Sequence, residues 1–101
     1  MPWEEYQEFQ ARLDRESRTA PAVLYFDDGQ DPLVGTLERQ RQHLLFKSEN
    51  RTVTIFRSFL TALDPGDKPG ELRFTIDRSP LAAIVFTPVR EIGWIYWAAG
   101  R

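Results

Sequence analysis

The spacing at which hydrophobic residues recur changes once along this chain, near residue 20. Before that point the apolar residues recur at helical spacing and form a stripe about 120° wide. The members of this stripe are Trp3, Tyr6, Phe9 and Leu13. Pro2 suits a first helical position, and Pro21 disfavours helical geometry at Ala20. The pattern predicts a helix that begins near Pro2 and ends between Ser17 and Ala20, with the aromatic stripe as its packing face.

From Ala22 onward, apolar and polar residues alternate with a period of two, which is typical of strands. Turn-forming residues divide this part into strands at 22–26, 33–39, 43–48, 52–58 and 59–65, and then at 71–77, 81–87 and 91–100. Gly35 lies inside the second strand, where it permits sharp curvature or a bulge in a small barrel. The pattern predicts one mainly β domain: a helix (1–20), a strongly bent five-stranded barrel (21–65) and a β extension (66–101).

This order of elements, a helix and then five strands with the second bent at glycine, resembles the Sm-like (SH3-like) fold. The resemblance covers about residues 10–65 and is specifically to the bacterial RNA chaperones of the Hfq family. That family has a strand ending in Asn-Gly or Asp-Gly and then a Leu-x-Gly strand. Asp28-Gly29 and 33–35 (LVG) match this motif with one extra residue in the turn. A second motif, an aromatic residue, Lys, His and an apolar run to Pro, corresponds to 56–65 (FRSFLTALDP).

The resemblance implies a ring-shaped homo-oligomer that binds single-stranded RNA, with the fourth strand of one subunit paired to the fifth strand of the next. Arg57 takes the place of the family's pocket Lys, and Tyr25 that of a Tyr that stacks on purines. The residues assigned to RNA by the resemblance and by the arginine-rich segment are Tyr25, Arg39, Arg41, Phe46, Lys47, Phe56, Arg57 and Ser58. Ser58 replaces the family's His, and three acidic residues, Asp27, Asp28 and Asp31, lie near the first turn. These departures put a uridine pocket of the usual kind in question.

Charge leaves a second interpretation open. The net charge of −2 and the pI of about 5.4 argue against a strong nucleic-acid binder. Residues 39–57, however, contain five basic residues and one acidic residue, which favours a surface for RNA. The alternative is a protein–protein interaction module, such as an inhibitor, adaptor or immunity-type protein. Such a module would use the barrel and the last strand, which contains Trp94, Tyr96 and Trp97.

The residue inventory argues against catalysis and against cofactors. The chain has no Cys, which excludes disulfides, thiolate zinc sites and cysteine nucleophiles, and His43 is its one histidine. The segment 27–31 (DDGQD) lacks the closing Glu of a calcium-binding loop, so a hairpin turn explains it better. No apolar run reaches the roughly 18 residues of a membrane span. The acidic N-terminus is unlike a secretory signal. We therefore expect a cytoplasmic, non-enzymatic protein without cofactor or metal.

Overall fold

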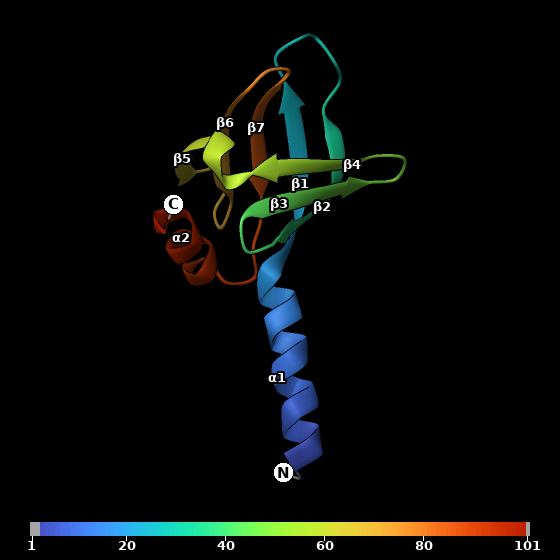
Figure 1. Ribbon diagram of the computed structural model, residues 1–101, viewed down its shortest axis with the longest axis vertical. Helices are drawn as coiled ribbons and strands as arrows, with labels where there is room; N and C mark the ends of the chain where they lie inside the picture. Colours follow the sequence, from blue (N-terminus) through green and yellow to red (C-terminus); the bar gives the residue numbers. More distant parts are fainter. Residues whose placement is uncertain (1–2, 101) are drawn as a thin grey trace.

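The computed structural model describes residues 3–100, except for the side chains of residues 9–16. A long N-terminal helix stands on one end of a curled antiparallel sheet, and a short C-terminal helix packs beside that sheet (Figure 1). The elements are α1 (Trp3–Arg18), β1 (Thr19–Phe26), β2 (Leu33–Arg39), β3 (His43–Ser48), β4 (Thr52–Phe56), η1 (Arg57–Phe59), β5 (Leu60–Pro65), β6 (Leu72–Arg78), β7 (Leu81–Phe86) and α2 (Ile92–Ala99).

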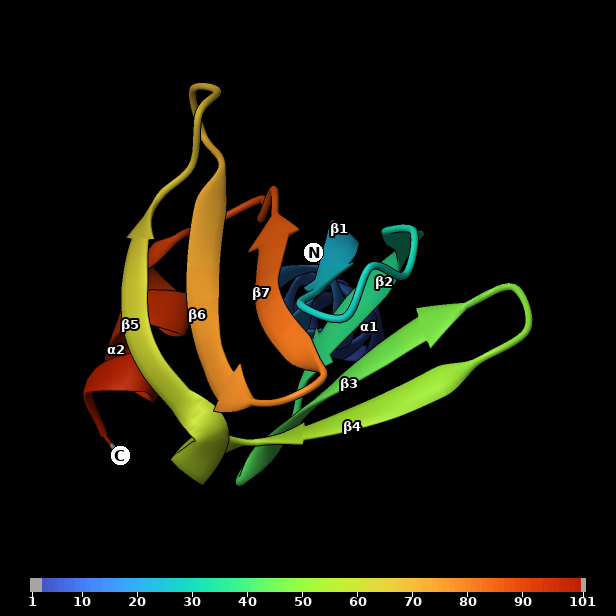
Figure 2. The same ribbon diagram turned by 90° about the horizontal axis from the view of Figure 1, so that it is seen from above.

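Seven strands form one sheet in the order β4-β3-β2-β1-β7-β6-β5. Every neighbouring pair is antiparallel, and the sheet curls into a half-barrel whose two edges, β4 and β5, are joined through η1 (Figure 2). The expectation of a mainly β, barrel-like fold is confirmed. The expected number of five strands is wrong, because β6 and β7 are inserted between β5 and β1 and belong to the same sheet. Residues 66–87 are therefore part of the half-barrel and not an extension of it.

The C-terminal segment is a helix, so the strand predicted at 91–100 is wrong. The physical reason is the spacing of its tryptophans. Trp94 and Trp97 are three residues apart, which places both on one face of a helix, whereas a strand would pair Trp94 with Tyr96. Trp94 is fully buried and Tyr96 is 71% exposed, which is the helical arrangement. A short run that is apolar throughout gives no period from which to choose between strand and helix.

The core fills the inside of the half-barrel and consists of apolar side chains. Its buried members are Ala20, Ala22, Leu24, Leu37, Leu44, Phe46, Ile55, Leu60, Leu72, Phe74, Ile76, Leu81, Ile84, Phe86 and Trp94. Among the residues whose side chains are described, no polar or charged residue is fully buried. The ring of Phe86 stacks on Phe74 at 5.4 Å between centroids and lies 4.6 Å from Trp94. This contact joins α2 to the inside of the sheet.

Gly35 allows two strands to approach closely. A Cβ atom added at Gly35 would overlap with the backbone carbonyl oxygen of Lys47 on β3. The register is continuous on both sides of Gly35, with Ala22 opposite it on β1 and Ser48 opposite it on β3. Of the two alternatives predicted at Gly35, sharp curvature or a bulge, the bulge is absent, and the glycine allows the close approach of β3.

The helix α1 projects away from the body of the protein along its longest axis (Figure 1). The molecule measures 53 × 30 × 27 Å along its principal axes. The helix ends at Arg18, inside the predicted window, and β1 follows at once. Trp3 and Tyr6 stack on each other but are 68% and 45% exposed, so the predicted packing face is wrong for these two residues. Phe9 and Leu13, the other members of the stripe, have side chains outside the described part.

Candidate binding surfaces

Two of the arginines assigned to RNA lie against the tryptophans of α2. The guanidinium carbon of Arg39 lies 5.1 Å from the centroid of Trp94, and that of Arg57 lies 4.3 Å from Trp97. Both distances fit cation–π contacts, which contribute about 0.5 to 2 kcal/mol according to how far they are desolvated. Burial, and secondarily repulsion from Arg18, lowers the pKa of Arg39 below its usual value. These two cations therefore help to hold α2 on the sheet.

A hydrogen bond holds α2 at a second point. The indole Nε1–H of Trp97 donates to the backbone oxygen of Gln40 at 2.7 Å, in the turn between β2 and β3. In contrast, Nη1 of Arg39, Nε of Arg57 and Nε1 of Trp94 are buried and have no hydrogen-bond partner among the residues that the structure describes. The contacts of Arg39 and Arg57 with the tryptophans of α2 were not predicted from the sequence. They depend on the helical spacing of Trp94 and Trp97, which places both rings on one face of α2.

The remaining residues assigned to RNA do not converge on one surface. Phe46 is fully buried in the core, so neither face of its ring is open to a base. Lys47 Nζ lies 3.9 Å from Glu38 Oε2 in an ion pair at the surface. Arg41 is exposed in the turn after β2. Tyr25 lies on the outer face of β1, where it lines a different hollow from the one lined by Phe56.

Three consecutive predicted residues, Phe56, Arg57 and Ser58, do line one cavity of about 520 Å³, which also borders Gln42 and Gly100. The ring of Phe56 is half-exposed and has edge contacts with His43 and Phe59. We call this cavity the Phe56 hollow. It contains an aromatic face, and Arg57 is the one cation among its described lining residues.

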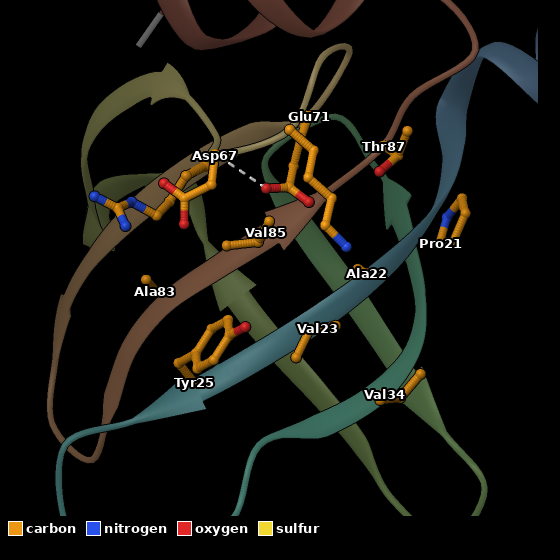
Figure 3. A pocket seen from close by; sticks show the side chains of 12 residues that line it. Pro21, Ala22, Val23, Tyr25, Val34, Asp67, Glu71, Ala83, Val85 and Thr87 are labelled. Atoms are coloured by element: carbon orange, nitrogen blue, oxygen red, sulfur yellow. Dashed lines mark hydrogen bonds between the residues drawn. The ribbon is translucent and has the colours of Figure 1, made fainter.

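The larger candidate surface is a groove of about 660 Å³ on the outer face of the sheet (Figure 3), which we call the outer groove. Its lining residues are Pro21, Ala22, Val23, Tyr25, Val34, Asp67, Lys68, Glu71, Arg73, Ala83, Val85 and Thr87. Val23 lies opposite Val34 on β2 and Val85 on β7, so three valines form a row across three strands. Tyr25, opposite Ala83, extends this apolar floor toward the end of β1. The floor is open, because Val34 is 75% exposed.

The sequence of β1 explains the groove. Every second residue of β1 is buried in the core, namely Ala20, Ala22 and Leu24. The residues between them that face outward, Val23 and Tyr25, are also apolar or aromatic. An antiparallel sheet with one solvated face normally carries polar residues there. A strand that is apolar on both faces indicates that something covers its outer side. The sequence contains this pattern, but of its outward residues only Tyr25 was assigned to a binding surface from the sequence.

Charged side chains of the hairpin between β5 and β6 form one rim of the outer groove. Within this hairpin, the backbone N–H of Asp67 donates to Glu71 Oε1 at 3.0 Å (Figure 3). No acidic side chain in the described part of the chain forms an ion pair with Lys68 or Arg73. The rim therefore offers two unpaired cations beside an apolar floor.

Two further features, a metal site and a membrane-spanning helix, are absent from residues 3–100 as far as these are described, that is, without the side chains of 9–16. No group of three or more His, Cys, Asp or Glu residues there is placed to hold a metal ion. None of the described helices is both long enough and apolar enough to cross a membrane.

No family model matches this sequence, and no curated protein matches it. Among solved structures, the chain is similar to the C-terminal domain of an unknown protein from Leishmania infantum. The two share 12% sequence identity and superimpose with a TM-score of 0.50 over 95% of this chain and 91% of the other. At this identity the likeness concerns the fold alone.

Proposed function

We propose that this protein is an interaction module that binds an amphipathic helix of a protein partner in the outer groove. The observation that carries this proposal is the row formed by Val23, Val34 and Val85, an apolar floor that no described part of the chain covers. Exposed apolar surface that is contiguous and rimmed by polar residues marks interaction sites.

The shape and chemistry of the groove select the kind of partner. A helix packed on the face of a sheet is a standard way to bury an apolar sheet face. Tyr25 offers a ring that is 40% exposed at one end of the floor, where it can pack against an aromatic or aliphatic anchor. At the rim, Lys68 and Arg73 can pair with acidic residues on the flank of that helix, while Asp67 and Glu71 bring the formal charge of the rim to zero. The partner is therefore a helix with an apolar stripe and an acidic residue on the flank that meets these two cations.

A titration followed by methyl NMR tests this proposal on the full chain. The probe is a synthetic 16-residue helical peptide with a Leu/Trp stripe and Glu on its flanks, and a scrambled peptide of the same composition is the control. We expect saturable shifts of the Val23, Val34 and Val85 methyl signals with the first peptide only. We expect Val34→Asp to abolish binding and Thr54→Asp, an equally outward change on β4, to leave it intact. Saturable binding that leaves these methyl signals unmoved would refute the proposal, as would no binding at all.

RNA binding at the Phe56 hollow is a second candidate, because Phe56, Arg57 and Ser58 line a common cavity. The sheet edges also suit the ring of the Sm-like resemblance. In that ring the fourth and fifth strands pair between subunits, and here β4 and β5 are the two edge strands. Gel shifts with poly-U and poly-A RNA at two salt concentrations test this candidate. Stacking on Phe56 predicts that Phe56→Ala weakens binding by about 1–3 kcal/mol, and absence of any shift at low salt would exclude it.

A further inference from the structure

We infer that the helix bound in the outer groove is α1 of a second copy of this chain, so that two copies exchange α1 reciprocally. This inference rests on the proposed function, namely that the groove accepts an amphipathic helix. It adds the identity of the partner and the symmetry of the assembly.

The first support is that α1 is an amphipathic helix with an uncovered aromatic face. Trp3 and Tyr6 stack at 5.8 Å between ring centroids while remaining largely exposed. The helix projects from the body (Figure 1) instead of folding back onto the sheet. A helix of this length in isolation is marginal in water, and most helical stability in proteins comes from packing of an apolar face. The Trp3 and Tyr6 side chains, which no described part of the chain covers, are therefore available to a surface of another chain.

The second support is that helix and groove each carry an apolar surface beside charged residues. At 100° per residue, Glu5 is the acidic residue that borders the aromatic stripe of α1, while Glu4 and Glu8 lie on the opposite, polar face; all three are exposed. At the groove, Lys68 and Arg73 are cations without an ion pair among the described residues. The rim also contains Asp67 and Glu71. Glu71 accepts a hydrogen bond from the backbone N–H of Asp67 but keeps its charge, so the four charged rim residues sum to zero and only Lys68 and Arg73 favour the approach of Glu5.

The third support is length and direction. In Figure 1, α1 continues directly into β1 along the long axis. The 16 residues of α1 span about 24 Å, and the outer-groove stretch of β1, from Pro21 to Tyr25, spans about 16 Å. A two-fold axis perpendicular to this line, near the junction of α1 and β1, lays each helix antiparallel over the groove of the other copy. Such an arrangement is self-complementary and closes at two copies.

Analytical ultracentrifugation of the full chain tests the exchange. We expect a mass of twice 11.8 kDa at micromolar concentration. Val34→Asp, which damages the groove, and the double variant Trp3→Ala/Tyr6→Ala, which damages the helix, are each expected to weaken dimerisation by about tenfold or more. Thr54→Asp on β4 is the matched control and is expected to dimerise like the unmodified chain. Circular dichroism verifies that each variant is folded.

Mixing the two damaged variants gives the decisive result. Each variant alone lacks every intact helix–groove contact, but the mixture restores one contact between the intact helix of Val34→Asp and the intact groove of Trp3→Ala/Tyr6→Ala. The second contact of the heterodimer carries both defects. Because each defect alone is expected to abolish its contact, the other defect adds no further loss there. We therefore expect heterodimers tighter than either variant's homodimer and weaker than the unmodified dimer. A monomer throughout, a dimer insensitive to Val34→Asp, or a mixture without recovery would each overturn the inference. The peptide titration decides the proposed function separately when it is run on Trp3→Ala/Tyr6→Ala, because the groove of this variant is intact and its damaged helix no longer competes with the peptide.

Discussion

Truncation of Trp94 is expected to be the most damaging single change in α2. The Trp94 side chain is fully buried, contacts Phe86 and lies under the guanidinium of Arg39. Trp→Ala in a core costs about 3–5 kcal/mol, and loss of the cation–π contact adds about 0.5–2 kcal/mol. Removal of the unpaired buried indole N–H offsets about 1–3 kcal/mol of this. Taken at their midpoints, these contributions give an expected net loss of about 3 kcal/mol, against a total stability of about 5–15 kcal/mol for small domains.

Urea unfolding followed by far-ultraviolet circular dichroism measures this loss without relying on tryptophan fluorescence. Tyr96→Ala is the control, since it removes an aromatic ring from the exposed side of the same helix. We expect it to change the free energy of unfolding by no more than about 0.5 kcal/mol. Trp94→Phe retains a ring under Arg39 and removes the unpaired N–H, so its loss is expected to be well below that of Trp94→Ala. A Trp94→Ala variant as stable as Tyr96→Ala would refute the packing of α2 described above.

Three further changes test other parts of the structure by the same unfolding measurement. Gly35→Ala is expected to cost about 1–3 kcal/mol, because its Cβ overlaps with the Lys47 carbonyl; an unchanged midpoint would show that β3 does not approach so closely. Trp97→Phe removes the donor to the Gln40 carbonyl and is expected to cost about 1–2 kcal/mol; no loss would mean that this bond is not formed. Arg57→Ala is expected to cost about 1–2 kcal/mol through its contact with Trp97, whereas an arginine used only for RNA would leave stability unchanged.

Local periodicity was sufficient to predict most of the elements. The end of α1 and the strands β2 and β3 lie where alternation and turn residues put them. The pairing of β7 with β1 was not predictable in this way, because it joins residues about 60 positions apart and depends on which strand edges remain free. The C-terminal helix was missed because its residues are apolar on every side and show no period.

The candidate site was harder to predict than the fold. Residue type suggested that Arg39 and Arg57 bind phosphate, but a guanidinium also stacks well on an indole ring, and these two do so inside the chain. Whether an arginine is free to bind phosphate depends on its exposure, and exposure depends on tertiary packing that the sequence pattern does not show. Phe46 and Tyr25 were both assigned to base stacking, yet the former is buried and the latter lines the outer groove.

The central claim is that the outer groove is a docking surface covered by a helix of a second copy. The most direct measurement is relaxation of methyl signals by a soluble gadolinium chelate, followed as the concentration of the full chain is raised. In the single chain Val34 is 75% exposed and Thr54 on β4 is also exposed, so we expect the methyl signals of both to relax quickly at low concentration. We expect relaxation of Val34 to fall as dimers form while that of Thr54 stays constant. Val34 methyls that remain as accessible as Thr54 at every concentration would contradict the claim.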